Sequence, residues 1–442
     1  MWLIDLILIA VACFFCLKII QIYGARAILL VWTMLTFAQQ IASTIYLNTG
    51  VYVNELGRTT YYVAKSTPLF ILYVDIFLFF LVCFGKNKMS ISRDAVILES
   101  TNLSTLVCYS SLLLTIALAG YTILDMLVSG IPMMTSVITH YNYYTTYSRL
   151  PMASTINNLL GTSMYLLGYA YVHIDKKHFR RICVLLVLST MIVRFMLGYK
   201  MSGLIDIPLN FIAVAVLLSK VNFKTLRQVI KPQYVLLGLV IALGVVALFV
   251  FSVISSGTAD DASIAFQVFM NRAFGLGNHL WWSAEADTVS GNSLFGHNLL
   301  AEFDAILTGK SQYDVSIGMY HLMKKYGDRY IVGVDIEHQI RYAATFITTA
   351  VYNFGYLFAP IQLAINAKIM VWFISLIDYA VKEDRFFQLL LLCKVWGTFS
   401  TFITASGTMT EWLNLENYLY LLLYFVLRYF IGNRRFEIRI DV

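Results

Sequence analysis

Long apolar runs recur along most of this 442-residue chain and predict membrane-spanning helices. Each run holds about 17 to 22 residues, the length that an α-helix needs to cross roughly 30 Å of hydrocarbon. We expect about eleven spans, near residues 3–22, 28–47, 67–84, 105–128, 153–173, 182–197, 203–218, 234–254, one within 343–381, 387–403 and 415–431. The pattern therefore predicts an all-α polytopic membrane protein.

One long water-compatible stretch, residues 255–341, interrupts this pattern. Helices of polytopic proteins are usually joined by short loops, so a single oversized segment predicts a functional region. The pattern predicts three parts: an N-terminal bundle of about eight helices over 1–254, a large external segment with interfacial helices over 255–343, and about three C-terminal helices over 344–442.

Clusters of Lys and Arg in the short loops predict the orientation of the chain in the membrane, because short loops rich in Lys and Arg usually face the cytoplasm. They lie at 86–93, 176–181, 220–231, 382–385 and 434–439, which places the long segment and the N-terminus outside and the C-terminus inside. Residues 343–381 are long enough for two crossings, but two would move Arg385 outward. We expect one crossing, preceded by a partly buried helix that breaks at Asn353, Gly355 and Pro360.

Composition and motifs exclude several classes of protein. With 59% hydrophobic and 13% charged residues, the chain is too apolar for a soluble domain. The Lys and Arg residues behind its net charge of +7 lie in loops that we expect in the cytoplasm. The positive-inside rule explains them there without nucleic-acid binding. The chain has no phosphate-binding loop, zinc-protease or hydrolase motif, so we predict no metal and no cofactor.

Three cations are expected near the outer boundary of the membrane. Arg272 lies in an apolar interfacial stretch, where it could equally snorkel or pair with Glu285. Lys200 is a lone cation in a tight outer turn, which the positive-inside rule makes unusual. Arg194 is expected at membrane depth, where a charge indicates a functional site unless it pairs with Asp206 or Asp125.

Two other groups of polar residues face outward in this topology. Arg149 closes the loop over 129–152, in which Tyr143 and Tyr144 could stack on sugars or belong to an interfacial aromatic belt. Glu337, His338 and Arg341 end the long segment. A histidine beside a carboxylate can take a proton near neutral pH, although such a residue is often only a satisfied polar group.

Several cations at an outer membrane face, with no metal site, match the headgroup of a lipid diphosphate. Planar guanidinium groups bind phosphate oxygens in a bidentate manner and stabilise the charge of a leaving diphosphate. If a sugar is attached to that diphosphate, the same cations favour glycosyl transfer. A base for the acceptor hydroxyl would then complete the site.

At this point the chain resembles a known family. The segments concerned are 130–132 with Arg149, 198–202, 271–274, and His338 followed by Tyr352-Asn353-Phe354-Gly355. They are similar to motifs of the Wzy class of O-antigen and enterobacterial common antigen polymerases and, more distantly, of O-antigen ligases, which have a GT-C-like fold. Lys200 stands where that family has arginine. Since lysine cannot form the two parallel hydrogen bonds that a guanidinium group makes to phosphate, Arg149 or Arg194 could bind the phosphate in its place.

The resemblance implies a mechanism at the periplasmic face of the bacterial inner membrane. Two undecaprenyl-diphosphate-linked glycans would meet, one chain would be transferred to the other, and undecaprenyl diphosphate would leave without metal assistance. Arg272 and Lys200, helped by Arg149 or Arg341, would bind the donor diphosphate. His338 would orient or deprotonate the acceptor hydroxyl, with Glu337 as the alternative base. The family also implies a Wzz-like partner that controls chain length.

Other classes remain open from the sequence. A ligase would differ from a polymerase chiefly in its acceptor, which is lipid A core rather than a lipid-linked repeat. A flippase or secondary transporter would also place charges among helices, but the hydropathy shows no internal repeat of the kind common in that class. A non-enzymatic assembly subunit could share the topology, although it gives no reason for cations at three outer loop ends.

Overall fold

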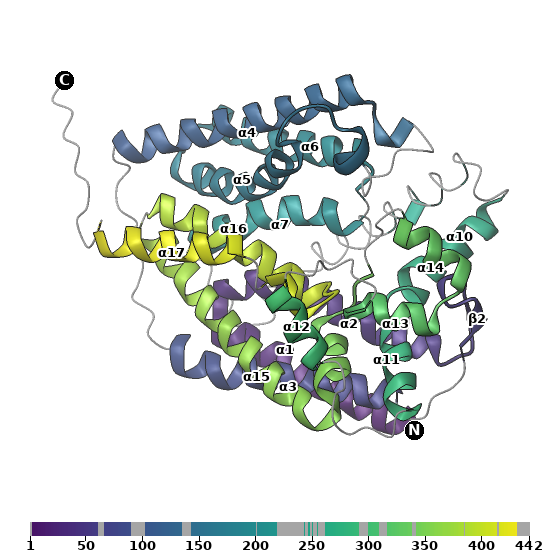
Figure 1. Cartoon of the computed structure of the whole chain (residues 1–442). Helices are drawn as coiled ribbons and strands as arrows, with labels where there is room; N and C mark the ends of the chain where they lie inside the picture. Colours follow the sequence, from purple (N-terminus) through teal and green to yellow (C-terminus); the bar gives the residue numbers. More distant parts are fainter. Residues whose placement is uncertain are drawn as a thin grey trace. The chain divides into compact units, whose positions relative to one another are not determined.

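The computed structural model describes residues 2–60, 66–89, 102–134, 143–199, 201–218, 261–290, 299–308, 316–337, 342–383, 385–412 and 415–430, with isolated positions between 243 and 254 (Figure 1). The chain forms two compact units. Unit 1 comprises Met1–Ser90, Asn222–Val371 and Ser400–Leu413, and unit 2 comprises Ile91–Val221, Trp372–Phe399 and Asn414–Val442. Each unit is therefore assembled from segments that are distant in sequence.

Long apolar helices form one part of unit 1. They are α1 (Trp2–Tyr23), the 3-10 helix η1 (Gly24–Leu30), α2 (Val31–Leu47), α3 (Ser66–Met89) and the first part of α15 (Phe346–Lys382). Helices α1 and α3 pack closely: the Tyr23 hydroxyl donates to the Leu81 carbonyl oxygen at 2.8 Å, and a Cβ at Gly85 would lie 2.5 Å from the Tyr23 ring. A side chain at Gly85 would therefore separate the two helices.

A hairpin and several short helices form the rest of unit 1, together with the 3-10 helix η6 (Met409–Trp412). We call the hairpin and α10 to α14 the short-helix group. Its elements are β1 (Tyr52–Val53), η2 (Asn54–Leu56), β2 (Arg58–Thr59), α10 (Ala262–Met270), the π-helical turn η5 (Asn271–Gly275), α11 (His279–Ser290), α12 (Leu299–Thr308), α13 (Gly318–Tyr326) and α14 (Arg329–Glu337). These elements are too short to be stable alone, so they depend on a shared core.

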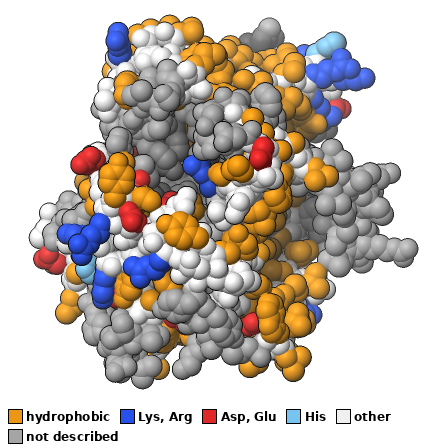
Figure 2. Space-filling view, turned by 90° about the vertical axis from the view of Figure 1, so that its right-hand side faces the viewer, with side chains coloured by type: hydrophobic (Ala, Val, Ile, Leu, Met, Phe, Trp, Pro, Cys, Tyr) orange, Lys and Arg blue, Asp and Glu red, His pale blue; other side chains and the backbone are white. Residues whose placement is uncertain are grey.

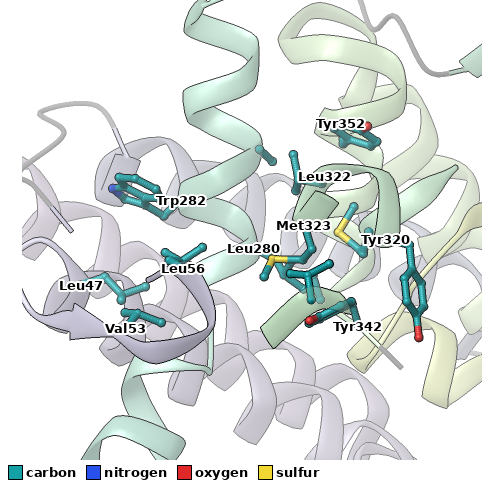
Figure 3. Packing of buried hydrophobic residues seen from close by; sticks show 14 residues of the cluster. Leu47, Val53, Leu56, Leu280, Trp282, Tyr320, Leu322, Met323, Tyr342 and Tyr352 are labelled. Atoms are coloured by element: carbon teal, nitrogen blue, oxygen red, sulfur yellow. The ribbon is translucent and has the colours of Figure 1, made fainter. Parts of the chain in front are cut away.

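That core joins the hairpin, α11 and α13 (Figure 3). Leu56 of the hairpin and Trp282 of α11 lie on one side, and Met323 of α13 and Tyr342 lie on the other. All four side chains are at most 4% exposed. Burying side chains of this size stabilises a fold by about 1.5 to 3 kcal/mol each, which makes this cluster the main force that holds the short helices in place.

Unit 2 is built around α5 (Ala153–His173), whose residues from Leu160 to Ala170 are all buried. Helix α5 packs against α4 (Asn102–Ser129) and α7 (Met201–Leu218), and α6 (Lys177–Met196) contacts all three. The second part of α15, most of α16 (Phe386–Thr404), α17 (Leu415–Phe430), the 3-10 turn η3 (Pro132–Met134) and the π-helical turn η4 (Tyr143–Tyr147) complete the unit. The central position of α5 explains why this stretch is buried on every side.

The observed helices confirm many of the predicted ones. The runs at 153–173 and 203–218 coincide with α5 and α7, and α15 has its non-helical residue at Gly355 (φ 70°, ψ 177°), one of the three predicted positions. Five stretches of the described chain are long and apolar enough to cross a membrane: Trp2–Leu47, Ser66–Lys88, Thr105–Met134, Phe346–Lys382 and Phe386–Thr404. The predicted span 234–254 lies almost wholly outside the described residues.

Apolar surface supports the same class of protein. Helices α1, α4 and α17 expose large apolar side chains, among them Leu3, Leu127 and Leu422. One face of the molecule shows broad hydrophobic areas, with charged side chains gathered in small groups (Figure 2). Since water-soluble proteins rarely expose so much contiguous apolar surface, the chain is an all-α membrane protein apart from its small hairpin.

We expect Gly168→Ala to destabilise unit 2. A Cβ at Gly168 would lie 2.2 Å from the Phe211 carbonyl oxygen, so α5 and α7 would have to separate. Overpacking of this kind costs about 1 to 3 kcal/mol. The melting temperature of the purified protein in detergent should fall by several degrees.

Gly120→Ala is the matched control, because a Cβ at Gly120 meets nothing within 4 Å. Alanine is the better helix former by up to about 1 kcal/mol, so the melting temperature should stay unchanged or rise slightly. Equal losses in both variants would contradict the close packing of α5 on α7.

Candidate functional site

Arg272 lies on the π-helical turn η5, which side chains of α2 hold in place. Gln39 donates to the Ala273 carbonyl oxygen at 2.6 Å, Ser43 donates to the Phe274 carbonyl oxygen, and the Tyr46 hydroxyl donates to the Asn271 side chain at 3.2 Å. These three donors are spaced four and three residues apart, so they share one face of α2. The backbone beside Arg272 is therefore fixed.

The segment after Arg272 packs equally closely on α2. Asn278 is 2% exposed and donates to the Thr44 hydroxyl at 2.6 Å. A Cβ at Gly277 would lie 2.9 Å from the Ser43 hydroxyl oxygen, so glycine is required for this approach. The Arg272 residue itself stays exposed to solvent. A rigid backbone thus presents a guanidinium group at the surface.

An ion pair lies close to Arg272. The His279 Nε2 atom lies 3.0 Å from the Glu55 Oε2 atom, and the His279 Nδ1 atom lies 3.0 Å from the Leu276 carbonyl oxygen. Burial by itself raises the pKa of the Glu55 carboxyl, but its hydrogen bond to His279 and the charges of His279 and Arg272 outweigh burial and lower the pKa. Glu55 is therefore a carboxylate that interacts electrostatically with Arg272.

The hairpin brings Glu55 to this place. Gly57 follows it with a positive φ of 61°, and the Glu55 carbonyl oxygen accepts from the Asp328 backbone N–H at 2.9 Å. A Cβ at Gly57 would lie 2.7 Å from the Asp328 carboxylate. Neither Glu55 nor His279 stands out in the sequence, because their pairing joins a loop after α2 to the start of α11.

In unit 2, Arg194 lies within a group of tyrosines. It is 8% exposed, donates to the Asn157 carbonyl oxygen at 2.8 Å, and stacks over the Tyr199 ring, with its guanidinium carbon 4.9 Å from the ring centre. A Cβ at Gly161 would lie 2.8 Å from one guanidinium nitrogen. Arg194 interacts electrostatically with Asp206, one of the two acids proposed for it.

Tyr143 and Tyr144 belong to the same aromatic group. Their rings are 5.0 Å apart, and Tyr144 packs with Tyr199 in a cluster that also contains Met126 and Val193. Tyr143 is fully buried. Burial, followed by the neighbouring Asp125, raises the pKa of Tyr143 far above its usual value. These tyrosines are therefore neutral side chains that shape the surroundings of Arg194.

Arg149 lies at the end of the same loop and is exposed. Asp125 fixes this loop by accepting from the Ser148 hydroxyl at 3.0 Å and from the Leu150 backbone N–H at 3.3 Å. The Arg149 backbone N–H donates to the Ser129 hydroxyl at 3.0 Å. As with Arg272, a fixed backbone carries an exposed guanidinium group.

The predicted site residues fall into three sets. Arg272 and Glu337 belong to unit 1, where Glu337 is the exposed last residue of α14. Arg149, Arg194, Tyr143 and Tyr144 belong to unit 2. Lys200, His338 and Arg341 lie outside the described residues. Within the described part of the chain, no group of three or more His, Cys, Asp or Glu could hold a metal ion.

Comparisons with known proteins identify one similarity. A model described as a family of unknown function, DUF6418, matches residues 312–421. This region covers α13, α14, α15, α16 and η6. No curated protein and no solved structure matches the chain. The similarity therefore concerns the C-terminal part of the short-helix group and the helices that follow it.

We expect Glu55→Gln to destabilise the protein at neutral pH by about 1 to 3 kcal/mol, because His279 loses its charged partner. Since folding lowers the pKa of Glu55, its stabilising effect is present above the ordinary carboxyl range and is lost as pH falls through the lowered pKa. Thermal unfolding should show a difference from wild type at pH 7 that narrows below about pH 4.

The exposed Asp304, substituted by Asn, serves as the control for this experiment. It should leave the melting temperature within about a degree of wild type, since surface substitutions usually change stability by less than 0.5 kcal/mol. If Glu55→Gln had the same melting temperature as the wild type at every pH, the pairing of Glu55 with His279 would add no stability.

Proposed function

We propose that this protein is a membrane glycosyltransferase that uses a lipid-diphosphate-linked glycan as donor. In this proposal it acts as the polymerases of O-antigen and enterobacterial common antigen do, at the periplasmic face of the bacterial inner membrane, and joins undecaprenyl-diphosphate-linked repeat units. The observation that carries the proposal is Arg272, an exposed guanidinium group on a backbone that α2 fixes by hydrogen bonds.

The chemistry of Arg272 fits a diphosphate better than a structural role. A snorkelling arginine needs no fixed backbone, whereas three side chains of α2 hold the turn that carries this one. Glu55 lies nearby and interacts electrostatically with both His279 and Arg272, and the exposed Arg272 side chain stays accessible to an anionic ligand. A guanidinium fork binds two phosphate oxygens and stabilises the charge that develops on a leaving diphosphate.

The remaining roles are assigned from the resemblance and from the chemistry of each side chain. Lys200, Arg149, Arg194 and Arg341 would bind the donor diphosphate, and Tyr143 and Tyr144 would shape the glycan-binding surface. His338 or Glu337 would act on the acceptor hydroxyl. The same proposal includes a GT-C-like arrangement of about eleven spans, with the N-terminus periplasmic and the C-terminus cytoplasmic, and a Wzz-like partner.

Arg272→Ala should weaken binding of undecaprenyl diphosphate by at least about tenfold, because charge-assisted hydrogen bonds contribute roughly 1.5 to 3 kcal/mol. The measurement is the thermal stabilisation of the purified protein by that lipid. In a strain that depends on this chain as its polymerase, the same variant should give single-repeat glycan on a gel. Arg329→Ala removes another exposed arginine of unit 1 and should change neither result.

Three outcomes would distinguish the alternatives. Unchanged lipid binding and a normal glycan ladder in Arg272→Ala would overturn the role of Arg272. Wild-type protein that restores attachment of glycan to lipid A core, but no polymerisation, would favour an O-antigen ligase. Wild-type protein that moves lipid-linked glycan across the membrane without joining it would favour a flippase.

A further inference from the structure

Helix α12, labelled in Figure 1, carries a ridge of large exposed apolar side chains. Leu300 is 80% exposed, Phe303 is 49% exposed and Leu307 is 86% exposed. These residues are three and four positions apart, so they lie on one face of the helix. Single apolar side chains are normal on a protein surface, whereas a contiguous group of them indicates a surface that binds a partner.

The opposite face of α12 is anchored to the rest of unit 1. Glu302 is 1% exposed, and its Oε2 atom accepts from the Met409 backbone N–H of η6 at 3.0 Å. The same carboxyl interacts with the Asn353 side chain of α15. Ala305, close to one turn further along α12, is fully buried. These contacts fix the rotation of α12 about its own axis and leave the apolar ridge exposed.

The elements that anchor α12 lie at the ends of two membrane-length helices. Both α15 and α16 are long and apolar enough to cross a membrane. Ala344, just before α15, and Ser406, just after α16, form an antiparallel bridge, so these two helix ends lie at a similar depth. Asn353 lies about two turns inside α15. Helix α12 is therefore level with the first turns of α15, at the boundary of the membrane.

The apolar ridge lies close to a surface of α15 that lipid would cover. Leu357, Ile361 and Ile365 of α15 are 58%, 55% and 53% exposed, and they are spaced four residues apart. An exposed apolar face on a helix of membrane length is suited to contact lipid. Because Asn353 comes only four residues before Leu357, the lipid beside α15 also lies beside α12.

We propose that α12 is an interfacial helix whose apolar ridge inserts among the acyl chains of membrane lipids. A polar edge, with the exposed residues Asp304 and Thr308, lies beside the ridge, and the Thr308 hydroxyl donates to the Asp304 carbonyl oxygen at 2.7 Å. One face of α12 thus packs on protein, one face enters lipid, and the polar edge stays with headgroups and water, as in other amphipathic helices that lie in the membrane surface. This lipid contact does not depend on glycosyl transfer.

A protein partner fits the ridge less well than lipid does. Each side of a standard protein interface buries roughly 800 Å². Three side chains on a helix of 10 residues supply much less apolar area than that. Lipid needs no minimum area, because acyl chains already surround the neighbouring face of α15.

Thiol labelling in lipid nanodiscs tests whether the ridge is covered. Leu307→Cys should react with a charged, water-soluble maleimide at least about tenfold more slowly than Thr308→Cys, because a thiol among acyl chains stays protonated and away from water. Thr308 is the matched control, since it is the next residue of α12 and is also exposed, but on the polar edge. Wild-type protein gives the background from the six native cysteines. Equal rates for the two variants would overturn the lipid contact.

Photo-cross-linking identifies what covers the ridge. Benzoylphenylalanine in place of Leu307, in nanodiscs of phosphatidylethanolamine and phosphatidylglycerol, should form adducts with acyl chains that mass spectrometry detects. The same photoreactive residue in place of Ile361 gives the lipid adduct expected for α15. An adduct that joins two copies of the chain, or in cell membranes an adduct with another protein, would overturn the proposal. Slow labelling of Leu307→Cys without a lipid adduct would likewise show that protein covers the ridge.

Discussion

The turn η5 and the start of α11 depend on hydrogen bonds with one polar face of α2, an otherwise apolar helix. Gln39, Ser43 and Tyr46 donate to the backbone or side chains of η5, and Asn278 donates back to Thr44. Backbone groups beside lipid or apolar helices need partners, because water is not available to satisfy them. This constraint fixes the turn that carries Arg272 and the start of α11 that carries His279, so the position of both side chains follows from it.

The same constraint explains the contrast between Arg272 and Glu302. Near Arg272, side chains of α2 satisfy backbone groups of η5, and the Arg272 side chain remains exposed at the surface. Near Glu302 the packing of α12, α15 and the loop before η6 is equally tight, and the buried carboxyl accepts from the Met409 backbone N–H and interacts with the Asn353 side chain.

In unit 2, hydrogen bonds and ring contacts likewise fix the positions of two arginines. Asp125 fixes the loop of Arg149, and Tyr199 and Asn157 hold Arg194. Glycines permit these contacts where side chains would not fit: Gly161 makes room for the Arg194 guanidinium, and Gly168 allows α5 to contact the Phe211 backbone. In both units, close helix packing determines which charged groups are rigidly placed and which stay exposed.

The sequence by itself determined the class of protein and most helices, because apolar runs of membrane length depend on local composition alone. It also predicted the break in α15 at Gly355 and selected Arg272 and Arg194 as unusual charges. Only the tertiary structure brought Glu55 to His279 and Glu302 to Asn353, and only it divided the chain into two units built from distant segments. The physical reason is that hydropathy and spacing report which residues share a helix face, whereas pairs between separate elements arise from packing.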